Sequence, residues 1–156
     1  MRHIWSVLCQ KSIINQETNN LTLVELIEQV EISSAKPENL SLSVAAVQPV
    51  QHGTRPDYVT MRLELVTLWA RDEETKGEKG RARVRLLSPA KSQIFEEFYE
   101  VNLIQAPRFR QRNAMMGFPM GSETGEFVFH TEYYDEENDE YCEVAKTPLV
   151  INFLVE

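Results

Sequence analysis

Two alternating apolar stretches, separated by a short acidic segment, constrain this chain more than any other feature. In residues 125–134 the side chains alternate between the two faces of an extended chain, and Phe127 and Phe129 share the apolar face. The same alternation returns in residues 141–155. Residues 135–140 read Asp-Glu-Glu-Asn-Asp-Glu and are too polar to pack in a core. The pattern predicts an antiparallel hairpin whose apolar face needs a second layer to cover it.

Length and charge limit what such a hairpin can belong to. The chain has 156 residues, of which 42% are hydrophobic, and this predicts one compact domain over residues 1–156. Its formal net charge of -8 disfavours a nucleic-acid partner and an anionic membrane surface, because both would be approached against the protein's own field.

The first nine residues and the cysteines bear on the compartment. The opening apolar run is too short for a signal peptide or a membrane span, so we expect a soluble, cytoplasmic protein without membrane contact. Cys9 and Cys142 form no Cys-x-x-Cys motif, and we expect two reduced thiols on strands rather than a disulfide.

Most of the remaining chain also reads as strands separated by polar turns. Residues 3–9 are apolar on both faces, which is typical of a central strand. Residues 21–32 fit a helix or a strand interrupted at Glu28, and a hairpin with the first strand favours the strand. The charged residues 72–80 predict a second hairpin loop. The predicted strands cover residues 3–9, 21–32, 40–47, 58–71, 81–87, 94–103, 125–134 and 141–155.

This spacing of strands and turns is typical of a sandwich or a barrel. Because the strands are unequal in length and several are apolar on one face only, we expect an all-β, two-layer antiparallel sandwich of about eight strands. An immunoglobulin-like or C2-like arrangement fits this description.

Some of these stretches also resemble a known family. The short strand ending near Cys9, the Asn-rich residues 15–20 and the run Leu21-Thr-Leu-Val-Glu-Leu-Ile-Glu-Gln-Val30 are similar to the start of a family of small bacterial proteins of unknown function. The middle hairpin and the strand Gly125-Glu-Phe-Val-Phe129 are similar to that family too. The resemblance implies a β-sandwich and a bacterial or phage source, and it brings no catalytic residues.

Motifs that carry chemistry are missing from the sequence. His3, His52 and His130 stand in no metal-binding spacing, and each is expected to be a strand or loop residue. No Gly-rich phosphate loop and no Gly-x-Ser-x-Gly elbow occurs. We therefore expect no cofactor and no catalytic residues.

The acidic segment admits a metal hypothesis. Asp135, Glu137 and Asp139 could offer oxygen ligands to calcium in an end loop of the sandwich. The segment lacks the glycine of an EF-hand loop, and a solvated hairpin turn is the favoured interpretation.

Two rows of arginine at alternate positions are sharper features. They are Arg81, Arg83 and Arg85, and then Arg108, Arg110 and Arg112. One interpretation is a docking surface for an anionic partner, because guanidinium groups bind carboxylates and phosphates bidentately. The favoured alternative pairs them across strands with Glu96, Glu97 and Glu100.

The last feature is an apolar run within residues 114–121, with Met115, Met116, Phe118 and Met120. Its glycines and proline predict a loop rather than a regular element. Such a loop either plugs one end of the sandwich or meets another chain, and we predict a homodimer.

The sequence therefore favours a non-catalytic interaction module whose partner is another protein or a second copy of itself. The alternative is an enzyme or a metal-dependent ligand-binding protein that uses residues 135–140.

Overall fold

The computed structural model describes residues 1–15, 20–33, 58–73, 76–119 and 124–154. These residues form β-strands and turns without a helix. The strands are β1 (Arg2–Ile14), β2 (Leu21–Leu26), β3 (Gln29–Ser33), β4 (Tyr58–Ala70), β5 (Lys79–Leu87), β6 (Gln93–Asn102), β7 (Arg108–Pro119), β8 (Gly125–Asp135) and β9 (Glu140–Leu154).

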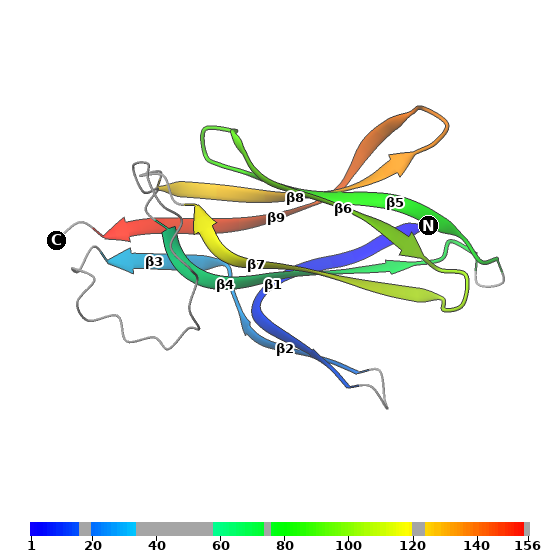
Figure 1. The fold of residues 1–156 in the computed structure, drawn as a ribbon, viewed down its shortest axis with the longest axis horizontal. Coiled ribbons are helices and arrows are strands. Elements are labelled where there is room, and N and C mark those ends of the chain that lie inside the picture. The colour runs from blue at the N-terminus through cyan, green and yellow to red at the C-terminus, as the bar shows by residue number, and fades with distance from the viewer. Residues whose placement is uncertain (16–19, 34–57, 74–75, 120–123, 155–156) are drawn as a thin grey trace, which may run out of the picture.

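The strands form two sheets that lie over one another, so the all-β, two-layer prediction is confirmed (Figure 1). Sheet A has the order β2-β1-β4-β7, and sheet B has the order β3-β9-β8-β5-β6. The pairs within them are antiparallel except for β3 and β9, which run parallel. The predicted hairpin of residues 125–155 is present as β8 and β9 at the centre of sheet B.

Alternation along the strands builds the core between the sheets. Sheet A contributes Leu63 and Leu65, and sheet B contributes Phe127 and Phe129, all almost fully buried. Burying one side chain of this size stabilises the fold by about 1.5–3 kcal/mol. Trp69 anchors a second cluster that includes Leu103, so two apolar centres hold the layers together.

Residues 27–28 carry the chain from one sheet to the other. The amide of Ile27 donates to the carbonyl of Leu8 in sheet A at 3.1 Å, and the amide of Val150 in sheet B donates to the carbonyl of Glu28 at 3.0 Å. The strand predicted over residues 21–32 is therefore two strands in different sheets. The break in alternation at Glu28 marks this crossing.

The hairpin predicted around residues 72–80 is wrong. β4 lies between β1 and β7 in sheet A, whereas β5 lies between β6 and β8 in sheet B. Both sides of β4 are already paired, so the chain after it must cross to the other layer. The strand predicted at residues 40–47 lies outside the described residues.

The loop predicted at residues 114–121 is also wrong over its described part. β7 continues to Pro119, and its backbone pairs Met115 with Leu63 and Phe118 with Val59. A glycine and a proline are tolerated here because β7 is an edge strand of sheet A, where an amide that faces outward needs no ladder partner.

Candidate interaction surfaces

The first arginine row lies on the outer face of sheet B, opposite the core. Ala82, Val84 and Leu86 of β5 point inward, so the alternate residues Arg81, Arg83 and Arg85 point outward.

A buried carboxylate of the neighbouring strand holds two of these arginines. Glu132 of β8, whose side chain is 3% exposed, accepts hydrogen bonds from Arg83 and Arg85. Arg83 also contacts Glu96 of β6 at 3.2 Å, one of the carboxylates that the sequence indicated. Reasoning from sequence missed Glu132, because nothing in the sequence shows that β8 lies on the other side of β5.

Two arginines of this row also contact tyrosine rings. The guanidinium of Arg81 lies 3.8 Å from the ring centroid of Tyr134, and that of Arg83 lies 4.1 Å from the centroid of Tyr141. Such cation–π contacts stabilise by about 0.5–1 kcal/mol at exposed sites. The first row is thus engaged within the protein by β8 and β9.

The second row has a different setting on β7. Arg108, Arg110 and Arg112 share one face of this edge strand, with Arg108 and Arg112 exposed and Arg110 half-buried. Within the described part of the chain, no carboxylate forms an ion pair with Arg108 or Arg112.

An apolar stripe runs beside this second row. Val66 and Leu68 of β4 stand opposite Arg112 and Arg110 in the ladder, and Trp5 of β1 stands opposite Leu68 on the other side. Residues opposite one another in an antiparallel pair share a face of the sheet. No described strand pairs with the outer edge of β7. Val66 is 1% exposed and Leu68 is 6% exposed, so this stripe is buried, and the row borders the open edge of β7 alone.

The methionine run is divided between the core and the chain end of β7. Met115 is buried among Leu63, Leu65 and Phe127 in the main core. Only the backbone of Met116 and Phe118 is described, and Met120 lies outside the described residues. Within the described residues, the run therefore contributes to the core through Met115.

The acidic segment forms the turn between β8 and β9. Asp135 accepts hydrogen bonds from the side chain of Asn138 at 2.7 Å and from the amide of Glu137 at 3.0 Å, and these bonds hold the pKa of Asp135 below its usual value. The hydroxyl of Tyr134 donates to Asp139. The described residues contain no group of three His, Cys, Asp or Glu side chains that could hold a metal ion.

Two of the histidines have polar partners. Nδ1 of His130 lies 2.5 Å from a carboxylate oxygen of Glu143. Nε2 of His3 lies 2.8 Å from the hydroxyl of Ser6. The Ser6 hydroxyl forms a second hydrogen bond, of 3.2 Å, with the hydroxyl of Thr67. Burial lowers the pKa of His3. His52 lies outside the described residues.

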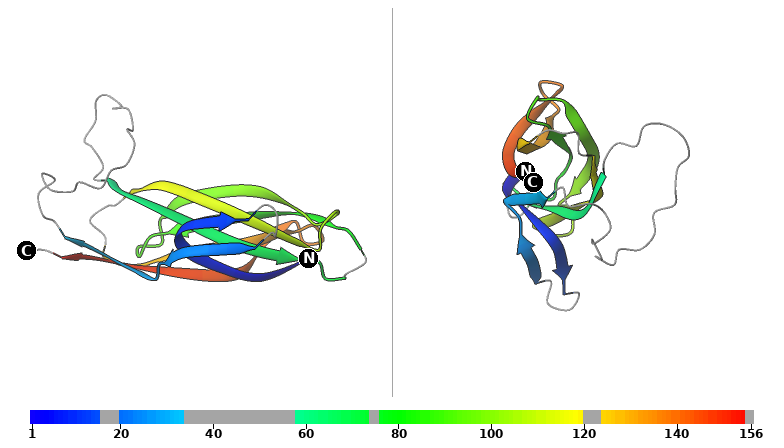
Figure 2. Two further views of the ribbon diagram at one scale, coloured as in Figure 1. Left: turned by 90° about the horizontal axis from the view of Figure 1, so that it is seen from below. Right: turned by 90° about the vertical axis from the view of Figure 1, so that its left-hand side faces the viewer.

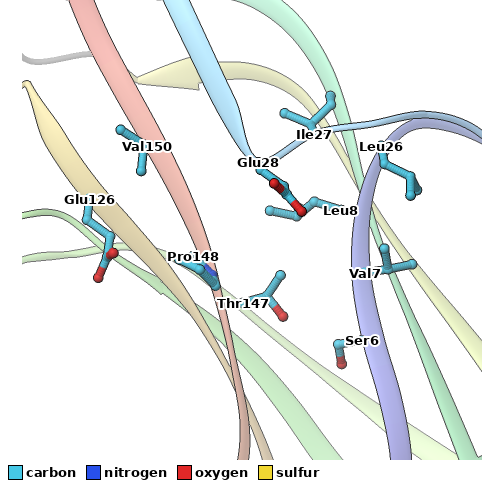
Figure 3. Close-up of a pocket in the computed structure, with 10 residues that line it drawn as sticks. All are labelled: Ser6, Val7, Leu8, Leu26, Ile27, Glu28, Glu126, Thr147, Pro148 and Val150. Carbon is cyan, nitrogen blue, oxygen red and sulfur yellow. The ribbon is translucent and has the colours of Figure 1, made fainter.

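A pocket of about 330 Å³ opens between the sheets beside the crossing residues (Figure 3). β1, β8, β9 and residues 26–28 all contribute to it, and the sequence contains no pattern that predicts it. The lining residues are Ser6, Val7, Leu8, Leu26, Ile27, Glu28, Glu126, Thr147, Pro148 and Val150.

Comparisons with models of known families, with curated proteins and with solved structures find no match to this chain. Among the described residues, no helix has the length and apolar character needed to cross a membrane.

Proposed function

We propose that this chain is a non-catalytic protein-interaction module, built as an immunoglobulin-like or C2-like sandwich, that binds an acidic extended segment of a partner along β7. One observation carries the proposal. Arg108 and Arg112 are exposed on an open strand edge and have no carboxylate partner within the described part of the chain.

The geometry of a strand edge suits an extended partner. Alternate residues of a strand lie about 7 Å apart, so a segment that adds to β7 can place an acidic side chain opposite each arginine of the row. Carboxylates bind guanidinium groups through paired, charge-assisted hydrogen bonds.

The protein's overall negative charge does not prevent such contacts. Charges are screened over about 8 Å at physiological ionic strength, so the arginine row dominates the field at contact distance. The first arginine row is a poorer candidate because Glu132 already neutralises much of its charge. The two rows look alike in the sequence and differ in their partners.

A labelled peptide in which glutamate alternates with valine tests the proposal by fluorescence anisotropy. We expect saturable binding that weakens with salt. The double change Arg108→Gln and Arg112→Gln should weaken binding about ten-fold, since two exposed ion pairs contribute about 1.4 kcal/mol together. Arg81→Gln is the matched control and should bind like the wild type. Absence of binding, or equal binding by all three proteins, would refute the proposal.

Self-association is a second candidate, favoured by a separate observation. The β1–β2 hairpin leads away from the body of the sandwich (Figure 2). The side chains of its residues Ile13, Ile14 and Leu26 are exposed. Sedimentation velocity at rising concentration tests for the homodimer. The double change Met116→Asp and Phe118→Ser should give a folded monomer if the methionine run forms the interface. A wild-type protein that remains monomeric at high concentration would exclude self-association.

A further inference from the structure

Two strand edges that are paired over only part of their length, one in β1 and one in β9, border the gap between the sheets. We call this gap the seam. β2 pairs with β1 only from Cys9 onward, so the first half of β1 has no described strand on that side. β3 pairs with β9 only from Val150 onward, so the preceding part of β9 also has no described strand on that side. The two uncovered halves approach one another across the open side of the sandwich (Figure 2).

The pocket described above lies in this seam, beside the point where residues 27–28 bridge it. Val7 and Leu8 of β1 form one wall, and Pro148 and Val150 of β9 form the other. Figure 3 shows Glu28 between these walls. The hydrogen bonds of the bridge to both sheets fix the backbone that carries this carboxylate.

The charged residues that line the pocket are both acidic. Glu28 lies between the walls, and Glu126 lies beyond Pro148 at the outer rim (Figure 3). Among the described residues, no lysine, arginine or histidine lines the pocket, and neither carboxylate forms an ion pair with a basic group. The hydroxyl of Thr147 adds a hydrogen-bond acceptor, whereas that of Ser6 already bonds to His3 and Thr67. A ligand with an aliphatic body and a cationic head complements this lining.

We propose that this pocket binds a primary aliphatic ammonium group, with the alkyl chain between the β1 and β9 walls and the ammonium on Glu28. The volume of about 330 Å³ is in the range of small-ligand sites, and it accommodates a chain of the length of a lysine side chain. The site lies apart from β7 and does not depend on the function proposed for the arginine row.

Titration with n-butylammonium chloride, followed by amide chemical shifts, tests this site. We expect saturable shifts of Ile27, Glu28 and Val150 in the wild type, and much weaker binding of butan-1-ol, which has the same alkyl chain without the charge. Sodium chloride at equal concentration corrects for ionic strength. Equal binding of the alcohol, or shifts that never saturate, would overturn the proposal.

Variants locate the charge contact. Glu28 is exposed, and Glu28→Gln should weaken n-butylammonium binding about five-fold, the upper size expected for an exposed ion pair. Glu136→Gln removes the same charge from the distant turn and should leave the affinity unchanged. Thr147→Val keeps the shape of the wall and should weaken binding less than Glu28→Gln does. Unchanged affinity in Glu28→Gln, in a protein whose spectrum shows a native fold, would contradict the assignment.

A last comparison identifies the source of the ammonium group. A capped Val-Lys-Val peptide that binds more tightly than n-butylammonium and shifts the same amides would support a peptide lysine as the ligand. Equal affinities would support a free amine. Failure of both compounds to shift these amides would refute the site.

Discussion

Glu64 of β4 accepts two hydrogen bonds from Ser12 of β1, one from the hydroxyl at 2.6 Å and one from the backbone amide at 2.7 Å. The carboxylate is completely buried, although its strand face points away from the main core. Arg62 completes the site with a contact of 2.6 Å. A buried charge is stable only when it is paired and hydrogen-bonded, so these contacts tie β1 to β4 in addition to the backbone ladder.

Removing the Ser12 hydroxyl should show how far stability depends on its hydrogen bond to Glu64. We expect Ser12→Ala to lower the free energy of unfolding by about 1–3 kcal/mol, because a buried carboxylate loses one of its donors. Urea denaturation measures the change. Ser92→Ala, at an exposed position, should have an effect below about 0.5 kcal/mol. Equal effects of the two changes would show that the hydroxyl is not needed.

Glu64 should also make stability depend on pH in acid. Burial raises the pKa of Glu64, but the hydrogen bonds from Ser12 and Arg62 outweigh it and hold the pKa below its ordinary value of 4.5. The carboxylate therefore contributes stability above pH 4.5, and this contribution is lost as the pH falls below that value through the folded-state pKa. Glu64→Gln should flatten the acid limb of the stability profile. An unchanged slope would contradict this role.

The two outer arginines Arg83 and Arg81 should differ in their effect on stability. Arg83→Gln should destabilise by about 1–3 kcal/mol, because it removes a donor from the buried carboxylate of Glu132. This exceeds the effect expected if Arg83 formed only exposed cross-strand pairs. Arg81→Gln loses only an exposed stacking contact and should cost less than about 1 kcal/mol. Thermal and urea unfolding of the two variants measure the difference, and similar losses would refute it.

The cysteines should react at very different rates. Cys9 is fully buried, and burial together with the negative charge of Glu64 raises the pKa of its thiol, whereas Cys142 is half-buried. A disulfide reagent at neutral pH should modify one thiol in the native protein and the second only after unfolding. Cys142→Ser should abolish the fast reaction. A fast reaction that persists in this variant would show that Cys9 is accessible.

The strands could be predicted from sequence better than their partners. Alternation is a local property, so β1, β4, β5, β6, β8 and β9 were each predictable from their own residues. Membership of a sheet depends on contacts across the whole chain. The segment between β4 and β5 resembles a hairpin loop, yet it crosses between layers because both edges of β4 are occupied.

The burial of charged residues could not be predicted from the sequence either. Glu64 and Glu132 look like ordinary outward-facing residues of alternating strands, and both are almost fully buried by neighbouring side chains. The arginine rows illustrate the same limit. Their spacing is identical in the sequence, but one lies beside Glu132 in the interior of sheet B and the other lies on the edge of sheet A. Only the three-dimensional neighbours separate a structural arginine from an available one.

Hydrogen exchange at β7 tests the central claim most directly. If an acidic segment adds to this edge, the outward-facing amides of β7 gain partners, and their exchange should slow when the alternating glutamate–valine peptide is present. The amides of β6, the edge strand of sheet B, serve as the internal control and should exchange at the same rate with and without peptide. Slower exchange confined to β7, and absent in the Arg108→Gln and Arg112→Gln double variant, is the predicted result. Unchanged exchange at β7 in the presence of saturating peptide would contradict the proposed function.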